Sequence, residues 1–299
     1  MVANSASKAW TLVTRTVSSW LDDYAPSMGA ALAYYTVFSV APLVLIVIAV
    51  AGLVFGQEAS QGEVVEQLQL LMGEEAAQAV QEMLRSVHQP ARGTLATIGG
   101  VAVLLVGATT VFAELQNSLD RIWRAPARTS SGVWNLVRAR LLSFGMILAI
   151  GFLMIVSLVA SAALAALATW WQPVFGSYER MASAFNTGLS FVFLAVSFAL
   201  IYKLIPRVSI AWRDVWLGAI VTALLFNFGK LLIGQYIGRT AITSTFGAAA
   251  SIAVLLIWVY YAAQIFLLGA EFTRVYAYTY GSLKGRPWPR PDASPQAPD

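Results

Sequence analysis

Six long stretches of this 299-residue chain are apolar and almost free of charge, and this pattern restricts the fold more than any other feature. A helix needs about 20 apolar residues to cross the hydrocarbon layer of a membrane. Only 11% of the residues are charged, whereas a soluble domain carries roughly 25%. The sequence therefore predicts an all-α, polytopic membrane protein. The predicted spans are residues 30–55, 94–113, 142–169, 182–203, 215–238 and 246–270.

The positions of Lys and Arg predict how these helices are oriented. If both termini lie in the cytoplasm, the inner segments carry 14 Lys and Arg residues and the outer segments carry four. An excess of positive charge on the cytoplasmic side is the usual arrangement. Dividing the long third stretch into two helices would move the basic segments 203–214 and 271–299 to the outside. We therefore expect six transmembrane helices, with both termini inside and the first span acting as an uncleaved anchor.

Three segments outside the spans have patterns of their own. Residues 1–23 place Trp and aliphatic residues at helical spacing, which predicts a helix in the cytoplasmic interface, although an ordinary packed helix fits equally well. The outer loop 57–92 has two apolar helical faces separated by Gly73, with Glu74 suited to a helix N-terminus, and predicts a helical hairpin. The Pro-rich segment 279–299 is predicted to be a disordered cytoplasmic tail.

Lys230 is the one Lys or Arg residue in the interior of a predicted span, since Lys203 lies at the very end of the span 182–203. A charge within the hydrocarbon layer is costly, so each such residue is by default a functional candidate. Lys230 lies roughly 22 Å along the helix from Val215, in the outer half of the membrane. It could hold an anionic head group in a polar cavity. The alternatives are a structural partner for another polar group or an amine that reaches the interface.

Two further polar faces lie near the predicted cytoplasmic ends of spans. Glu114, Asn117 and Arg121 share one helix face directly after the second span, at its cytoplasmic end. Glu271 closes the sixth span, and Gln264 lies seven residues before it. Together with Tyr34 and Tyr35 of the first span and Lys230, these residues form a candidate substrate path: Lys230, Glu114, Asn117, Arg121, Gln264, Glu271, Tyr34 and Tyr35. Ordinary ion pairs at helix ends would explain the two acids as well.

Composition argues against enzymatic chemistry. The chain has one His and no Cys, and it lacks a phosphate-binding loop and a zinc-protease motif, so we expect no catalytic residue, no metal and no cofactor. The arginines at 121–140 lack an aromatic stacking surface, so nucleic acid is not an expected partner. Anionic membrane lipids are the expected partners of these arginines, and the sequence leaves a homo-oligomer open.

Several motifs resemble those of the YihY family, also called the virulence factor BrkB family, of bacterial inner-membrane proteins. The resemblance covers residues 22–278. It rests on four motifs in order: AALAYYTVFSVAP (30–42), ELQNSLDRIW (114–123), PRV (206–208) with WRDVWLGA (212–219), and FGA (246–248) through LIWVY (256–260) to LGAE (268–271). It implies a multi-pass protein of the inner membrane, with six helices. Some members have carried the label ribonuclease BN, which this sequence does not support because clustered acids are missing.

The resemblance and the polar residues together favour a transporter that moves an anionic lipid or another envelope component. A membrane scaffold that maintains envelope integrity without transport is the alternative. A membrane-embedded hydrolase or nuclease ranks third.

Overall fold

A computed structural model describes residues 2–55, 64–66, 68–69, 73–87, 110–126, 145, 178–239 and 250–288. Within these ranges the regular secondary structure is helical throughout, as the sequence predicts. The helices are α1 (Val2–Asp22), α2 (Ala25–Phe55), α4 (Glu74–Val87), α7 (Tyr178–Leu204), α8 (Trp212–Arg239) and α10 (Ala250–Thr279). Residues 110–122 form a further helix.

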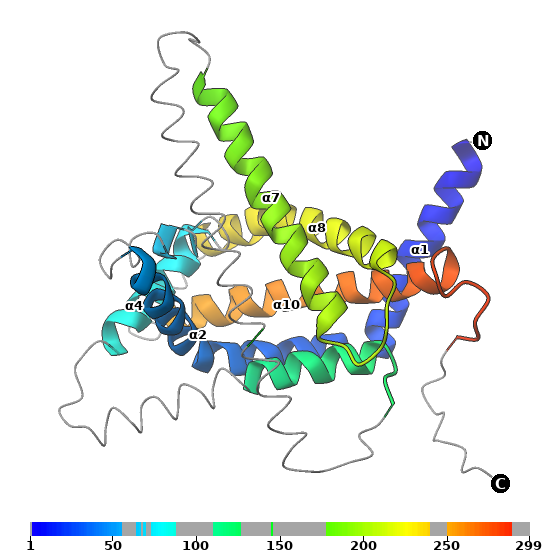
Figure 1. Cartoon of the computed structure of the whole chain (residues 1–299), viewed down its shortest axis with the longest axis horizontal. Coiled ribbons are helices and arrows are strands. Elements are labelled where there is room, and N and C mark those ends of the chain that lie inside the picture. Colours follow the sequence, from blue (N-terminus) through cyan, green and yellow to red (C-terminus); the bar gives the residue numbers. More distant parts are fainter. Residues whose placement is uncertain are drawn as a thin grey trace.

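Helix α10 lies at the centre of this bundle and contacts α1, α2, α4 and α8 (Figure 1). α7 packs on α8. The α8–α10 contact is close because small residues occupy the crossing: Gly218 faces Thr273, and Gly269 faces Thr222. Such small residues let two helices approach without large side chains between them.

Two apolar clusters fill the bundle at opposite ends. One surrounds Trp123, Tyr202 and Leu267, where α7, α8, α10 and the 110–122 helix meet. The other includes Val80 of α4 and Leu255 of α10. α4 begins at Glu74, directly after Gly73, whose φ of 85° is a backbone conformation that glycine tolerates best.

Three helices of the described part are long and apolar enough to cross a membrane: Thr187–Leu204, Trp212–Ile237 and Ala250–Thr279. They correspond to the fourth, fifth and sixth predicted spans. α2 covers the first predicted span. Of the second and third predicted spans, only 110–113 and Gly145 are described, so the six-span count lies partly outside the described residues.

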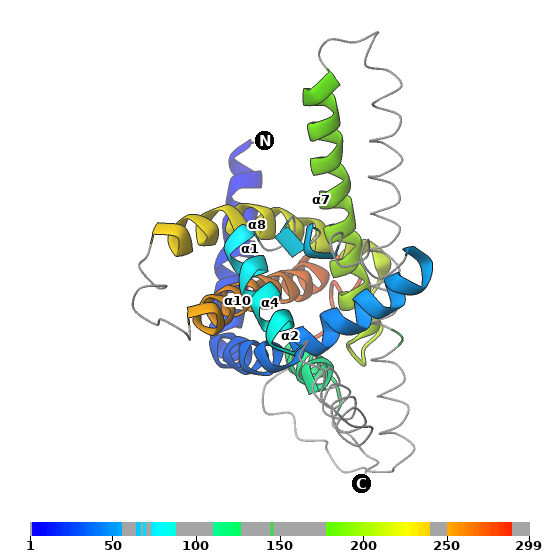
Figure 2. The same ribbon diagram turned by 90° about the vertical axis from the view of Figure 1, so that its left-hand side faces the viewer.

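Both ends of the described chain differ in detail from a plain six-helix bundle. α1 runs across the direction of α10, as Figures 1 and 2 show from two sides. α10 continues nine residues beyond the predicted end of the sixth span at residue 270, because Glu271 and Arg274 are buried in the protein. Residues 280–288, within the predicted tail, turn back so that Trp288 lies 5.0 Å from the Arg274 guanidinium.

Candidate functional site

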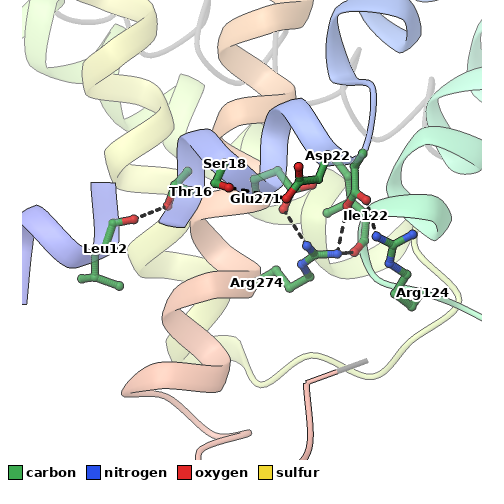
Figure 3. Close-up of polar contacts among 9 residues, drawn as sticks. Leu12, Thr16, Ser18, Asp22, Ile122, Arg124, Glu271 and Arg274 are labelled. Carbon is green, nitrogen blue, oxygen red and sulfur yellow. Dashed lines mark hydrogen bonds and ion pairs between the residues drawn. The ribbon is translucent and has the colours of Figure 1, made fainter. Parts of the chain in front are cut away.

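Four charged side chains gather where α1, α2, α10 and the 110–122 helix meet: Asp23, Arg124, Glu271 and Arg274. We call this group the ion cluster. Figure 3 shows Glu271 and Arg274 on the same helix, α10, with Arg124 beside them from the end of the 110–122 helix. The side chains of Asp23, Glu271 and Arg274 are at most 2% exposed, and that of Arg124 is 22% exposed. The ion cluster is therefore sealed from solvent on most sides.

Asp23 enters the ion cluster from the turn between α1 and α2. α1 ends at Asp22, and the amide of Asp23 still donates to the carbonyl of Ser19. Tyr24 then takes a φ of 57°, which reverses the chain before α2 begins at Ala25. This turn directs the Asp23 carboxylate inward while the Tyr24 ring stays exposed.

Arg124 enters from the end of the 110–122 helix. Its φ is 52°, the left-handed conformation that often ends a helix and usually belongs to glycine. The amide of Ala125 donates to the carbonyl of Asp120 and closes the helix end. The guanidinium of Arg124 pairs with Oδ1 of Asp23, a residue 101 positions away in the sequence.

Arg274 is the centre of the ion cluster. Its Nη1 donates to Oδ2 of Asp23 at 3.0 Å and to the carbonyl oxygen of Ile122. Its Nη2 lies 3.2 Å from Oε2 of Glu271, one turn earlier on α10. The ring of Trp288 lies over the guanidinium. Arg274 thus joins the turn between α1 and α2, the end of the 110–122 helix and the end of α10.

The balance of charge explains how this group can be buried. Two acidic side chains face two guanidinium groups, so each buried guanidinium has an acidic partner. Removing one partner from a buried pair leaves an uncompensated charge and costs about 3–5 kcal/mol. The ion cluster therefore favours the arrangement of its segments in which all four charged side chains are paired. The acids present do not form a metal site among the described residues, and the expectation of no metal stays a prediction.

Further polar contacts hold neighbouring segments at the same end. Asp120 pairs with Arg207 at 3.3 Å and accepts a hydrogen bond from the amide of Arg207. Asp214, at the start of α8, is fully buried and accepts hydrogen bonds from the amide and the hydroxyl of Ser282. These contacts join the α7–α8 connection to the 110–122 helix, and the start of α8 to the turn that follows α10.

The predicted path residues of α8 and α10 lie at different positions along the length of the bundle. Glu271 belongs to the ion cluster. Gln264 is half-buried, and its Nε2 lies 3.5 Å from the carbonyl oxygen of Pro26 in α2. Lys230 is half-buried on α8, eight residues beyond Thr222, which packs against Gly269. Because α8 and α10 are antiparallel here, Lys230 and Glu271 are at least roughly 12 Å apart along the bundle.

The other predicted path residues lie at the surface or near it. On the 110–122 helix Glu114 is half-buried, while Asn117 and Arg121 are exposed; the Arg121 guanidinium lies 5.5 Å from the Tyr24 ring. Tyr34 is exposed on α2 and Tyr35 is half-buried, with their ring centroids 5.5 Å apart. The described structure thus does not bring the eight residues together, and their role as a path stays a prediction.

Comparison with known proteins identifies the family. A sequence profile of the family described as virulence factor BrkB matches residues 16–293, which is most of the chain and includes the whole ion cluster. The chain belongs to the virulence factor BrkB family. The predicted resemblance is therefore confirmed, and so is the broader prediction of a membrane protein.

Relatives of this BrkB-family chain are named UPF0761 membrane proteins. One from Verminephrobacter eiseniae is 29% identical over 84% of this chain and 58% of its own length. One from Pseudomonas aeruginosa is 27% identical over 84% of this chain and 59% of its own length. The chain thus spans a little under three-fifths of the length of these two relatives. No solved structure matches it.

Sequence reasoning found one member of the ion cluster and missed three. Glu271 was a candidate because it follows a long apolar stretch. Arg274 lies three residues later on the same helix face, and this spacing could have indicated the pair. Asp23 and Arg124 carry no such local signal, because their partners are 101 and 251 positions away in the sequence.

Proposed function

We propose that this BrkB-family chain is a six-span inner-membrane protein, with both termini in the cytoplasm, that moves an anionic lipid or envelope component. The observation that carries the proposal is the position of Lys230. It is half-buried beside the outward face of α8, where large apolar side chains are exposed: Leu224, Phe228, Leu231 and Leu232. A cation in this position can meet the head group of an amphiphile whose chains contact that apolar face.

The apolar residues around Lys230 make this contact chemically specific. Gly229 is buried against Tyr261 and Ile265 of α10, whereas Leu231 is 62% exposed. Lys230 therefore lies at the boundary between the packed side of α8 and the side that faces lipid. An ammonium group at this boundary attracts a phosphate or carboxylate through charge as well as hydrogen bonds, whereas an uncharged head group can only accept its hydrogen bonds. This supports an anionic substrate.

The ion cluster has a separate part in the proposal. It joins α10 to the α1–α2 turn and to the 110–122 helix at one end, while Lys230 lies further along the bundle. A substrate that passes Lys230 would then reach α10, the α1–α2 turn and the 110–122 helix. The ion cluster fixes the positions of these three segments relative to one another. Movement would be passive or coupled to an ion, and no enzymatic step is included. Anionic membrane lipids are the proposed partners.

The proposal is tested by reconstituting the full chain in vesicles that carry fluorescent phosphatidylglycerol in both leaflets. An impermeant reductant then bleaches the outer leaflet, and continued loss of signal reports movement between leaflets. We expect faster loss than in empty vesicles. Lys230→Ala should slow it about tenfold, the equivalent of ~1.4 kcal/mol, and Lys230→Arg should retain most of it. Arg213→Ala is the matched control, because Arg213 lies on the same helix and is 74% exposed.

Wild-type protein that moves phosphatidylglycerol no faster than empty vesicles would overturn the transport proposal. That result would favour the second candidate, a membrane scaffold without transport. The sealed ion cluster is the observation that favours a scaffold, because it fixes several segments in one arrangement and leaves little access to its charges.

A further inference from the structure

We propose that α1 lies flat on the membrane surface at the ion-cluster end of the bundle, with one row of apolar side chains in contact with lipid. This row consists of Trp10, Val13, Val17, Leu21 and Tyr24, and we call it the apolar stripe. Its members are 71%, 51%, 42%, 55% and 63% exposed. The inference requires only a membrane protein and does not rest on lipid movement.

Three sides of α1 can be distinguished by their surroundings. The first side packs on the bundle: Thr16 and Asp23 are buried, and Trp20 packs against the apolar cluster around Trp123. α1 contacts α10 on this side. This contact fixes α1 against the bundle and leaves its other two sides open.

The apolar stripe forms the second side. Successive helical residues are turned by roughly 100°, so residues 10, 13, 17 and 21 gather about a quarter-turn from Thr16, and the exposed Tyr24 follows in the turn after α1. The third side lies about a quarter-turn in the opposite direction and is polar. It carries Lys8, Arg15 and Asp22, all exposed. The packed side therefore lies between an apolar side and a charged side.

This order of sides fits one environment. A helix beside a membrane bundle, at the surface of the bilayer, has protein on one flank, lipid below and water above. α1 shows the same sequence of packed, apolar and polar sides. A helix surrounded by water would have no reason to carry five large apolar side chains in one row.

The direction of α1 agrees with this placement. α10 extends along the bundle, and α1 crosses that direction beside the C-terminal part of α10 in both views (Figures 1 and 2). Trp10 and Tyr24 stand at the two ends of the apolar stripe, and both residue types favour the boundary between lipid and water. Lys8 and Arg15 supply positive charge for anionic head groups.

The absence of cysteine from the chain makes the test direct, because single cysteines can be introduced without removing others. Full-length Val17→Cys and Ser18→Cys are a matched pair: both positions are exposed, and they are neighbours on different sides of α1. Val13→Cys and Thr11→Cys form a second pair. Each variant is spin-labelled in vesicles containing phosphatidylglycerol, and its collisions with oxygen and with a water-soluble nickel chelate are measured.

We expect the labels at 13 and 17 to collide with oxygen several-fold more, relative to nickel, than the labels at 11 and 18. Equal ratios within each pair would overturn the proposal, because α1 would then be surrounded by water. Low collision with both reagents at 13 and 17 would also overturn it, because the apolar stripe would then be covered by protein, such as a second copy of the chain.

Discussion

Arg124 combines an unfavourable backbone conformation with a buried ion pair. Residues other than glycine pay about 1–2 kcal/mol for the left-handed conformation, and Arg124 adopts it with a φ of 52°. A glycine would end the 110–122 helix more easily but would bring no charge to Asp23. At this position arginine forms the ion pair with Asp23 at the cost of a less stable backbone than glycine would give.

We predict that Arg124→Ala lowers stability more than Arg124→Gly. Both changes remove the ion pair with Asp23, but only glycine relieves the backbone, so the two variants should differ by about 1 kcal/mol. Thermal unfolding of the purified protein in detergent measures the difference. Arg15 provides the control: it is exposed within α1, where glycine is worse than alanine by about 1 kcal/mol. If alanine were the milder change at both positions, this account of Arg124 would be wrong.

The ion cluster also shows which site residues a sequence can reveal. Glu271 could be predicted because an acid beside a long apolar stretch stands out. Asp23 could not, because Asp22 precedes it in the same amphipathic segment and is exposed in the structure. Only the turn at Tyr24 decides which of the two acids enters the protein.

At the scale of elements, the crossing of α8 and α10 depends on close approach at two glycines. A side-chain carbon added to Gly269 would lie 2.6 Å from the hydroxyl of Tyr202 and 2.9 Å from Cβ of Thr222. Tyr202 in turn donates to the carbonyl oxygen of Phe266 at 2.7 Å, so it cannot move away without losing that bond. This contact holds α7, α8 and α10 together.

We predict that Gly269→Ala destabilises the protein by about 1–3 kcal/mol, the usual cost of overpacking. Gly234→Ala is the matched control on α8, because an added carbon there meets nothing within 4 Å. The control should be neutral or up to about 1 kcal/mol more stable, since alanine favours helix. Thermal unfolding of both variants in detergent checks the pair. Equal stability of the two variants would show that the crossing tolerates an extra carbon.

Helix positions were more predictable than helix contacts. Long apolar stretches with almost no charge marked α7, α8 and α10, because the hydrocarbon layer imposes length and composition on a spanning helix. The continuation of α10 to Thr279 was not predictable in this way, since Glu271 and Arg274 look like the charged end of a span until their partners are known. Likewise, periodicity indicated a helix in residues 1–23 but did not tell which side of it would pack.

At the scale of the whole molecule, the ion cluster and α4 mark opposite ends of the bundle (Figure 1). α4 packs beside the start of α10, near Val254 and Leu255, whereas the ion cluster lies near its end. If α10 crosses the membrane, these two ends face different compartments. The distribution of Lys and Arg predicts that the ion-cluster end lies in the cytoplasm.

We predict that the Glu82→Cys variant reacts with a membrane-impermeant maleimide added to intact bacterial spheroplasts, whose inner membrane is exposed to the medium. The Pro126→Cys variant should react only after the membrane is permeabilised. Both positions are exposed, and neither Glu82→Cys nor Pro126→Cys requires removal of a native cysteine. Each variant serves as the control for the other, because one must be accessible before permeabilisation and the other must not. Labelling of Pro126→Cys from outside would reverse the assigned orientation. Labelling of both variants from outside would contradict a membrane crossing by α10, because the two ends of that helix would then face the same compartment.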